Sequence, residues 1–315
     1  MCNAMRCYAS YALGLLGSVH IVHKPVFLSV EPAAVCQLRC PECPVGQGAN
    51  RQISGNPFMP RKVWQRVLAE AAPFVHTIQF YFQGEPLLHK DLPSMIREAH
   101  EAGIYTIVST NAQALTPELA EELVRAGLNR IIISMDGLTQ DSYGAYRAGG
   151  DLQQCKAALR WLHEASTKRS LLFRRLIVEL QVLRLRTNER EWDTFRREYK
   201  ALGADRLVFK TAQLYNYADG HPLMPSDPRY SRYAKGTDGR YHRKPVSKGC
   251  FRVWSGAVIT TTGEVLPCCY DKAYAHSFGN IMETPLSVLY NNEKAVAFRR
   301  AALRHKPQIC HECWK

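Results

Sequence analysis

The chain has 315 residues, of which 46% are hydrophobic and 22% charged, and these values are typical of a globular protein that buries a sizeable core. No apolar run approaches the roughly 20 residues that a membrane-spanning helix needs. The 41 Lys and Arg residues outnumber the 28 Asp and Glu residues, which gives a net charge of +13. This excess suits an anionic partner, although a solvated basic surface explains it equally well. No aromatic-rich nucleic-acid motif accompanies the charge, which argues against nucleic acid as that partner.

The first 26 residues form a segment of their own. Arg6 followed by the apolar stretch 8–19 resembles a short signal peptide, but no clear small-residue cleavage site precedes the first strand. We expect instead an amphipathic helix that either lies on a membrane surface or caps the fold. The second interpretation needs no partner, and the first implies a peripheral membrane contact.

From residue 27 onward, short β-branched runs alternate with longer amphipathic stretches, and this pattern predicts strands alternating with helices. Thr116 is the predicted N-cap of a helix that starts at Pro117 and ends at Gly127. The predicted strands cover residues 27–31, 77–83, 104–110, 130–137, 176–184 and 206–210. The predicted helices cover residues 61–72, 92–103, 117–127, 151–167 and 189–202.

Six β–α pairs with short connections favour a parallel sheet with helices outside it, because parallel strands need crossover connections. Composition changes after the sixth strand. The predicted parts are the N-terminal segment, an α/β core, a long connecting loop, and a small α+β domain with a hairpin that turns at Thr262 and Gly263 and a helix over 285–303. They cover residues 1–26, 27–214, 215–249 and 250–315.

Eleven cysteines are many for a protein of this size, and their spacing matters more than their number. Cys36, Cys40 and Cys43 lie within eight residues after the first predicted strand, and Cys310 and Cys313 form a second tight group. Close spacing favours a metal or an iron–sulfur cluster, and therefore a reducing, cytoplasmic compartment. Cys2, Cys7 and Cys155 are isolated and are not expected to bind metal.

The first group offers three thiolates without a local fourth ligand. A four-iron cluster held this way keeps one iron open, which can chelate the amino and carboxylate groups of a methionine. A zinc site completed by a distant residue, for instance His23 or His89, is the alternative for the same cysteines.

The spacing CxxxCxxC after the first strand resembles the radical SAM superfamily, whose members reductively cleave S-adenosylmethionine (SAM) at a [4Fe-4S] cluster. The resemblance continues at the ends of the next three strands and implies a partial (β/α)6 barrel. It assigns SAM binding to Gly84, Glu85 and Pro86 after the second strand, Ser109 and Asn111 at the third, and Ser134, Asp136 and Arg147 at and after the fourth.

Two positions depart from the pattern of that superfamily. The residue before the third cysteine is usually aromatic and flanks the adenine, whereas here it is Glu42. The motif after the second strand often reads GGEP, whereas here Gln83 replaces the first glycine. Neither change removes a cluster ligand, but the departure at Glu42 leaves the adenine contacts unassigned.

The C-terminal cysteines resemble the SPASM domain or its shorter relative, the twitch domain, which hold auxiliary iron–sulfur clusters. The resemblance implies one auxiliary [4Fe-4S] cluster on Cys250, Cys268, Cys310 and Cys313, with Cys269 as the rival of Cys268 if the hairpin register differs by one. A closed set of four thiolates suggests an electron conduit. A structural zinc site fits the same four cysteines.

The resemblance implies an oxidoreductase or maturase that uses SAM to abstract a hydrogen atom from its substrate. It does not identify that substrate. A peptide and a small molecule both remain open, and Lys210, Gln213 and Tyr215 after the sixth strand are candidates to contact an anionic substrate. A low-potential electron donor of the flavodoxin or ferredoxin kind is the implied partner. The alternative function is a non-enzymatic zinc-binding protein that binds nucleic acid.

Overall fold

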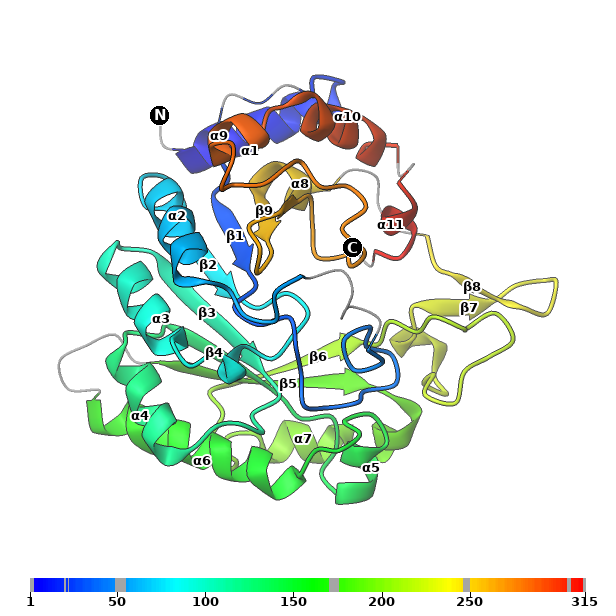
Figure 1. The fold of residues 1–315 in the computed structure, drawn as a ribbon. Helices are drawn as coiled ribbons and strands as arrows, with labels where there is room; N and C mark the ends of the chain where they lie inside the picture. The colour runs from blue at the N-terminus through cyan, green and yellow to red at the C-terminus, as the bar shows by residue number, and fades with distance from the viewer. Residues whose placement is uncertain are drawn as a thin grey trace. The chain divides into compact units, whose positions relative to one another are not determined.

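The computed structural model describes residues 3–19, 21, 23–48, 55–169, 176–245, 250–304 and 307–313. The chain divides into two compact units. The first unit comprises Met1–Val35, Ala49–Ile107 and Val246–Lys315, and the second comprises Cys36–Gly48 and Val108–Pro245. Figure 1 labels their helices and strands.

The first unit contains α1 (Asn3–Leu15), β1 (Phe27–Val30), α2 (Arg61–Ala71), β2 (Thr77–Phe80), η1 (Pro86–Leu88), α3 (Leu92–Glu101), the start of β3 (Tyr105–Thr110), α8 (Phe251–Ser255), β9 (Gly256–Ile259), β10 (Val265–Leu266), α9 (Leu286–Leu289), α10 (Glu293–Ala302) and α11 (Gln308–His311). The second unit contains the end of β3, α4 (Pro117–Arg125), β4 (Arg130–Ser134), α5 (Gln140–Gly144), α6 (Leu152–Arg169), β5 (Ile177–Arg184), η2 (Arg186–Glu191), α7 (Trp192–Glu198), β6 (Arg206–Thr211), η3 (Pro228–Tyr230), β7 (Tyr233–Lys235) and β8 (Tyr241–Arg243).

The predicted alternation of strands and helices is confirmed. The main sheet has the strand order β10-β9-β1-β2-β3-β4-β5-β6. Strand β1 pairs in parallel with β2, and β5 pairs in parallel with both β4 and β6. Thr116 caps α4 as predicted, because its side chain accepts a hydrogen bond from the Leu119 backbone.

In the first unit, the C-terminal part of the chain adds two strands to this sheet. Strand β9 pairs in parallel with β1, and the predicted hairpin joins β9 to the antiparallel β10. The backbones of β9 and β1 approach so closely that a Cβ atom on Gly256 would lie 2.5 Å from the Phe27 carbonyl oxygen. The parallel pairing was not predicted, because nothing in the local sequence reveals a partner more than 200 residues away.

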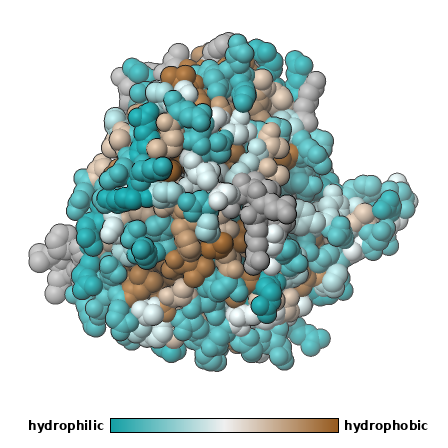
Figure 2. All heavy atoms as spheres, viewed as in Figure 1, coloured by the Kyte–Doolittle hydropathy of each residue, from teal (hydrophilic) through white to brown (hydrophobic). Residues whose placement is uncertain are grey.

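Helix α1 packs on α8 through its small residues. Cys7, Ser10 and Gly14 are buried, and the Cys7 thiol donates a hydrogen bond to the Trp254 carbonyl at 3.4 Å. Other large apolar residues of the helix stay exposed, namely Met5, Leu13 and Leu15, at 60%, 53% and 55%. Figure 2 shows the hydropathy of one face of the molecule, on which hydrophilic side chains surround smaller hydrophobic areas. No helix in the described ranges is long and apolar enough to cross a membrane.

In the second unit, β4, β5 and β6 carry α4, α6 and α7 on one side (Figure 1). The segment after β6 was predicted to be a connecting loop, but it contains η3 and the antiparallel pair β7 and β8. The Tyr233 ring of β7 stacks on Tyr217 of the preceding segment, with centroids 4.1 Å apart. The predicted helix over 285–303 is two helices in the first unit, since Asn292 caps α10 and separates it from α9.

Candidate functional site

The three clustered cysteines lie on one loop of the second unit, directly after the first unit's β1 segment in the chain. The Cys43 N–H donates to the Cys40 carbonyl at 3.2 Å, and the Leu38 N–H lies 3.4 Å from the Cys36 sulfur. Cys40 is buried, whereas Cys36 and Cys43 are partly exposed. Gln47 closes the loop, because its amide nitrogen donates to the Cys40 carbonyl at 3.0 Å.

A buried ion pair lies beside Cys40. The Arg147 Nε donates to Asp136 Oδ2 at 2.6 Å, and the other Asp136 oxygen accepts the Leu183 N–H at 2.6 Å. Burial raises the pKa of the Cys40 thiol, and the Arg147 guanidinium partly opposes that rise. The structure therefore brings Asp136 and Arg147, both predicted from the end of the fourth strand, to one cysteine of the loop.

Asn111 contacts another cysteine of the loop. Its Nδ2 donates to the Cys36 sulfur at 3.4 Å, and its Oδ1 accepts from Gln37 Nε2 at 3.2 Å. Of the other predicted residues at strand ends of this unit, Ser134 is buried at the end of β4 and Ser109 is partly buried in β3. The second unit thus gathers Asn111, Asp136 and Arg147 around the cysteine loop.

Gly84, Glu85 and Pro86 follow β2 in the first unit. A Cβ atom on Gly84 would lie 2.1 Å from the Ala33 carbonyl oxygen, so only glycine fits there. The Glu85 N–H donates to the Val35 carbonyl at 2.8 Å, and its side chain accepts from the Leu87 N–H. Gln83, which replaces the first glycine of the superfamily motif, donates to the Lys272 carbonyl at 3.0 Å. The close backbone approach therefore constrains the second glycine of that motif and leaves the first position free to vary.

The second group of cysteines belongs to the first unit. Cys250 precedes α8, Cys268 follows β10, and Cys310 and Cys313 lie at α11, where the Cys313 N–H donates to the Cys310 carbonyl at 3.3 Å. Burial raises the pKa of the Cys268 thiol, and charge repulsion from the nearby Cys269, Cys250 and Cys310 raises it further. The Arg252 Nη1 donates a hydrogen bond to the Cys269 sulfur at 3.5 Å.

Both groups fit iron–sulfur clusters by the chemistry of their donors. Within the ranges that the structure describes, no three Cys, His, Asp or Glu side chains are arranged to hold a single metal ion. Zinc would require all its ligands to converge at about 2.0–2.3 Å from one point. In a four-iron cluster each cysteine binds a different iron, so the thiols need not converge on one point.

The two histidines considered as zinc ligands have other partners. The His23 Nε2 lies 2.6 Å from the Trp254 carbonyl. His89 uses both ring nitrogens, with Nε2 2.9 Å from the Met59 carbonyl and Nδ1 accepting the Asp91 N–H at 3.1 Å. The isolated Cys7 and Cys155 are buried and donate to backbone carbonyls, and Cys2 lies outside the described residues.

The three substrate candidates follow each other at the end of β6. Lys210 is exposed, Gln213 is partly buried, and Tyr215 is 40% exposed. The Tyr215 N–H donates to Glu42 Oε2 at 2.7 Å, and Glu42 Oε1 lies 3.2 Å from His221 Nε2. The sequence had left Glu42 unassigned and had missed His221, because no motif links residues that are 179 positions apart.

Two family models match the chain. The model of the Radical SAM superfamily matches residues 30–178, and the model of an iron–sulfur cluster-binding domain, SPASM, matches residues 250–314. The two matches cover both cysteine groups. They do not support a non-enzymatic zinc-binding protein that binds nucleic acid.

Characterised relatives match over nearly the whole chain. A PqqA peptide cyclase from Ruegeria pomeroyi is 27% identical, and the match covers 93% of this chain and 80% of the relative. A tungsten-containing aldehyde ferredoxin oxidoreductase cofactor-modifying protein from Pyrococcus furiosus is 24% identical, with 91% and 86% covered.

Solved structures share the fold. SuiB from Streptococcus suis matches with a TM-score of 0.67 and 16% identity, covering 94% of this chain and 72% of that chain. BtrN in complex with AdoMet and 2-DOIA matches with a TM-score of 0.57 and 20% identity, covering 92% and 93%. The predicted fold class, an α/β fold of the partial-barrel type with a small C-terminal cysteine-rich domain, is confirmed.

Proposed function

Since this chain is a radical SAM enzyme with a C-terminal SPASM-type iron–sulfur domain, we propose that it abstracts a hydrogen atom from a peptide and leaves that peptide oxidatively modified. The observation that carries the proposal is the cysteine loop of the second unit. Asn111 contacts one cysteine of this loop and the Asp136–Arg147 pair lies beside another. The arrangement combines three thiolates with polar groups at strand ends.

Cys36, Cys40 and Cys43 would hold a [4Fe-4S] cluster with one open iron. A cluster bound there would supply the electron for reductive cleavage of SAM into methionine and a 5′-deoxyadenosyl radical. Asn111 orients the Cys36 sulfur through its amide, and Arg147 places a positive charge near the Cys40 thiolate and favours its ionised form. These contacts position the thiolates before the metal arrives.

The SAM contacts that we propose follow the superfamily pattern, and each unit is taken by itself. In the second unit they are Ser109, Asn111, Ser134, Asp136 and Arg147, and in the first unit Gly84, Glu85 and Pro86. Arg147 already makes an ion pair with Asp136, so its role toward SAM is electrostatic, through the charge balance of the buried pair. The backbone around Gly84 is held close to that of Ala33, which fixes the peptide groups offered to the ligand.

Cys250, Cys268, Cys310 and Cys313 would hold one auxiliary [4Fe-4S] cluster. Cys269 stays the rival of Cys268. The choice of Cys268 rests on the superfamily pattern, because the Arg252 contact to the Cys269 sulfur is compatible with either role. We propose that this second group serves electron transfer during substrate oxidation.

The names of the relatives support a peptide substrate. The Ruegeria pomeroyi relative is named a PqqA peptide cyclase, and SuiB has been solved with its precursor peptide SuiA. The Pyrococcus furiosus relative, named for cofactor modification, keeps a small molecule as the second candidate. Lys210, Gln213 and Tyr215 are the proposed contacts to this substrate.

Two partners complete the proposal. A low-potential flavodoxin- or ferredoxin-like protein would donate the electron, in a reducing, cytoplasmic compartment. The exposed apolar residues of α1 would make a peripheral membrane contact, because Met5, Leu13 and Leu15 are exposed on the same helix as the exposed Arg6. Sedimentation with vesicles of acidic phospholipid checks the second point, and Leu15→Glu should weaken the binding.

The deciding experiment measures 5′-deoxyadenosine after the anaerobically reconstituted, reduced protein is incubated with SAM. Wild type should form it and Cys40→Ala should not. Cys7→Ala is the matched control, because Cys7 is a buried cysteine outside both groups and its loss should leave product formation unchanged. Equal product from wild type and Cys40→Ala would refute the proposed function.

A further inference from the structure

Glu42 occupies the position before the third cysteine of the loop, and its carboxylate is fully engaged by the protein. Oε2 accepts the Tyr215 N–H at 2.7 Å, and Oε1 lies 3.2 Å from His221 Nε2. The side chains of Glu42 and His221 are only 11% and 13% exposed. Both partners belong to the segment 212–224 that follows β6, which we call the cover segment.

The second ring nitrogen of His221 fixes the direction of this contact. His221 Nδ1 accepts the Leu223 N–H at 3.2 Å and therefore carries no proton of its own. The proton of the neutral imidazole is then on Nε2, which donates to Glu42. Glu42 thus accepts two hydrogen bonds from the cover segment, one from a main-chain and one from a side-chain donor.

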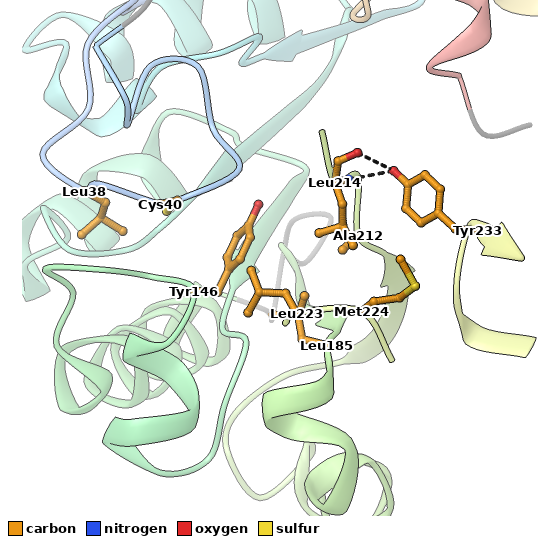
Figure 3. Close-up of a cluster of buried hydrophobic side chains, with 9 residues drawn as sticks. All are labelled: Leu38, Cys40, Tyr146, Leu185, Ala212, Leu214, Leu223, Met224 and Tyr233. Carbon is orange, nitrogen blue, oxygen red and sulfur yellow. Dashed lines mark hydrogen bonds between the residues drawn. The ribbon is translucent and has the colours of Figure 1, made fainter. Parts of the chain in front are cut away.

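Hydrophobic packing brings the same two parts of the chain together. Leu38 and Cys40 of the cysteine loop share a buried cluster with Ala212, Leu214, Leu223 and Met224 of the cover segment, and Figure 3 shows these side chains with Tyr146, Leu185 and Tyr233. The Tyr233 hydroxyl holds Leu214 from the other side, because it accepts the Leu214 N–H and donates to the Leu214 carbonyl, each at 2.8 Å. The cover segment is therefore fastened at both of its faces.

We propose that Glu42 is a positioning residue that fastens the cover segment to the cysteine loop, so that occupancy of the SAM site sets the position of the residues that meet the substrate. The inference rests on the proposed function for the meaning of that site. The geometry supports this role, because Glu42 directly precedes Cys43 in the chain and its carboxylate accepts the Tyr215 N–H. A rigid link of this kind keeps substrate and SAM in a fixed relation, which radical transfer between them requires.

Amide hydrogen exchange at Tyr215 tests the link. Glu42→Ala removes the acceptor of the Tyr215 N–H, so exchange there should be faster by about tenfold or more. Glu42→Gln keeps an acceptor oxygen and should restore most of the protection. Slow exchange at the buried Leu180 and Val182 of β5 verifies that each variant is folded.

Glu189→Ala is the matched control. The Glu189 carboxylate accepts the Ser226 N–H, so this variant loosens the same region of the chain at a point away from the cysteine loop. Exchange should rise at Ser226 and stay unchanged at Tyr215. Equal exchange at Tyr215 in wild type and Glu42→Ala would overturn the proposal.

Adding SAM to the reconstituted protein separates positioning from simple support. SAM should slow exchange at Tyr215 in wild type and Glu42→Gln and leave it unchanged in Glu42→Ala, while equilibrium dialysis shows bound SAM in all three. If dialysis finds no SAM binding even to wild type, the proposed function fails, whereas the exchange difference without SAM still tests the link. If SAM binds but slows exchange equally in wild type and Glu42→Ala, Glu42 does not couple the two sites.

Discussion

Single buried charged side chains account for much of the specificity of this fold. Asp136 is fully buried, and its two carboxylate oxygens are held by Arg147 and by the Leu183 N–H. Glu31, in the first unit, is also fully buried and accepts a hydrogen bond from the Tyr274 hydroxyl at 3.1 Å. The two carboxylates differ in their charged neighbours, because Asp136 pairs with Arg147 whereas Glu31 has no ion pair within the described residues.

Removing the charge of Asp136 should be costly. In Asp136→Asn the guanidinium of Arg147 stays buried without its counter-ion, so we expect the free energy of unfolding to fall by about 3 kcal/mol. Urea denaturation measures it. Asp193→Asn breaks an exposed pair with Arg196 in the same unit and should cost less than about 1 kcal/mol. Similar losses in the two variants would contradict this account of the buried pair.

Glu31 should make stability depend on pH. Burial raises the pKa of Glu31 to about 7, and the Tyr274 hydroxyl partly opposes that rise. As the pH rises, the unfolded state releases this proton near the ordinary pKa of a glutamate, about 4.3, whereas the folded state still holds it. The stabilisation from the protonated form is present below that value and is lost as the pH rises to about 7. The free energy of unfolding of Glu31→Gln, relative to that of wild type, should therefore increase by about 3 kcal/mol between pH 4 and pH 8.

Denaturation at several pH values compares the two proteins, and a difference that stays constant with pH would contradict the prediction. Tyr274→Phe provides a second check. It removes the donor that favours the ionised carboxylate, so the loss of stability should move to higher pH.

At the level of residues, sequence reasoning found positions but few contacts. It singled out Asp136, Arg147 and Asn111 from their places at strand ends, yet nothing in the sequence shows which partner each one meets. The contacts of Glu42 with Tyr215 and His221 depend on packing between parts of the chain that are far apart in sequence. Such pairs become visible only once the tertiary structure is known.

At the level of elements, one side chain of β7 ties that strand to the cover segment. The Tyr233 hydroxyl satisfies both backbone groups of Leu214, which is 1% exposed. Tyr233→Phe should leave these groups unsatisfied and lower the free energy of unfolding by about 2 kcal/mol. Urea denaturation measures the loss. Tyr230→Phe keeps the ring that packs on Trp192 and should change stability by less than about 0.5 kcal/mol, so equal effects would argue against the hydroxyl.

Elements were predictable where they carry a local pattern. The strands β1–β6 and the helices α2, α3, α4 and α6 lie within a few residues of their predicted positions, because hydrophobic periodicity and caps are local signals. The pair β7 and β8 and the short α5 and α11 were missed. Strands of three residues and helices of one turn contain too few residues to show a period.

At the level of the whole molecule, the two cysteine groups predict the iron content. Two four-iron clusters give about eight irons per chain in the anaerobically reconstituted protein. Cys268→Ala should lower this to about four, and Cys269→Ala should leave it near eight. Iron and acid-labile sulfide analysis measures both. A loss of iron in Cys269→Ala alone would make Cys269 the ligand.

The choice between these neighbours shows what spacing can and cannot predict. Spacing identified the group, but adjacent residues after a strand point to opposite sides, so the hairpin register decides which one joins the other cysteines. In the structure Cys268 is the more buried of the two, and Cys269 faces Arg252. The choice of Cys268 stays a prediction, which the iron analysis of the two alanine variants tests.

The backbone at Gly84 and Glu85 packs closely against the backbone at Ala33 and Val35. This contact has a consequence for whether folding precedes iron binding. The backbone that leads into the cysteine loop is anchored by main-chain hydrogen bonding and close packing, neither of which involves a thiol. Iron should therefore load onto an already folded scaffold, unlike a zinc finger, whose chain folds only as it captures its ion. A chelator that strips the iron should bleach the protein while its far-ultraviolet circular dichroism stays nearly unchanged, and a collapse of that signal would show that assembly and folding are one event.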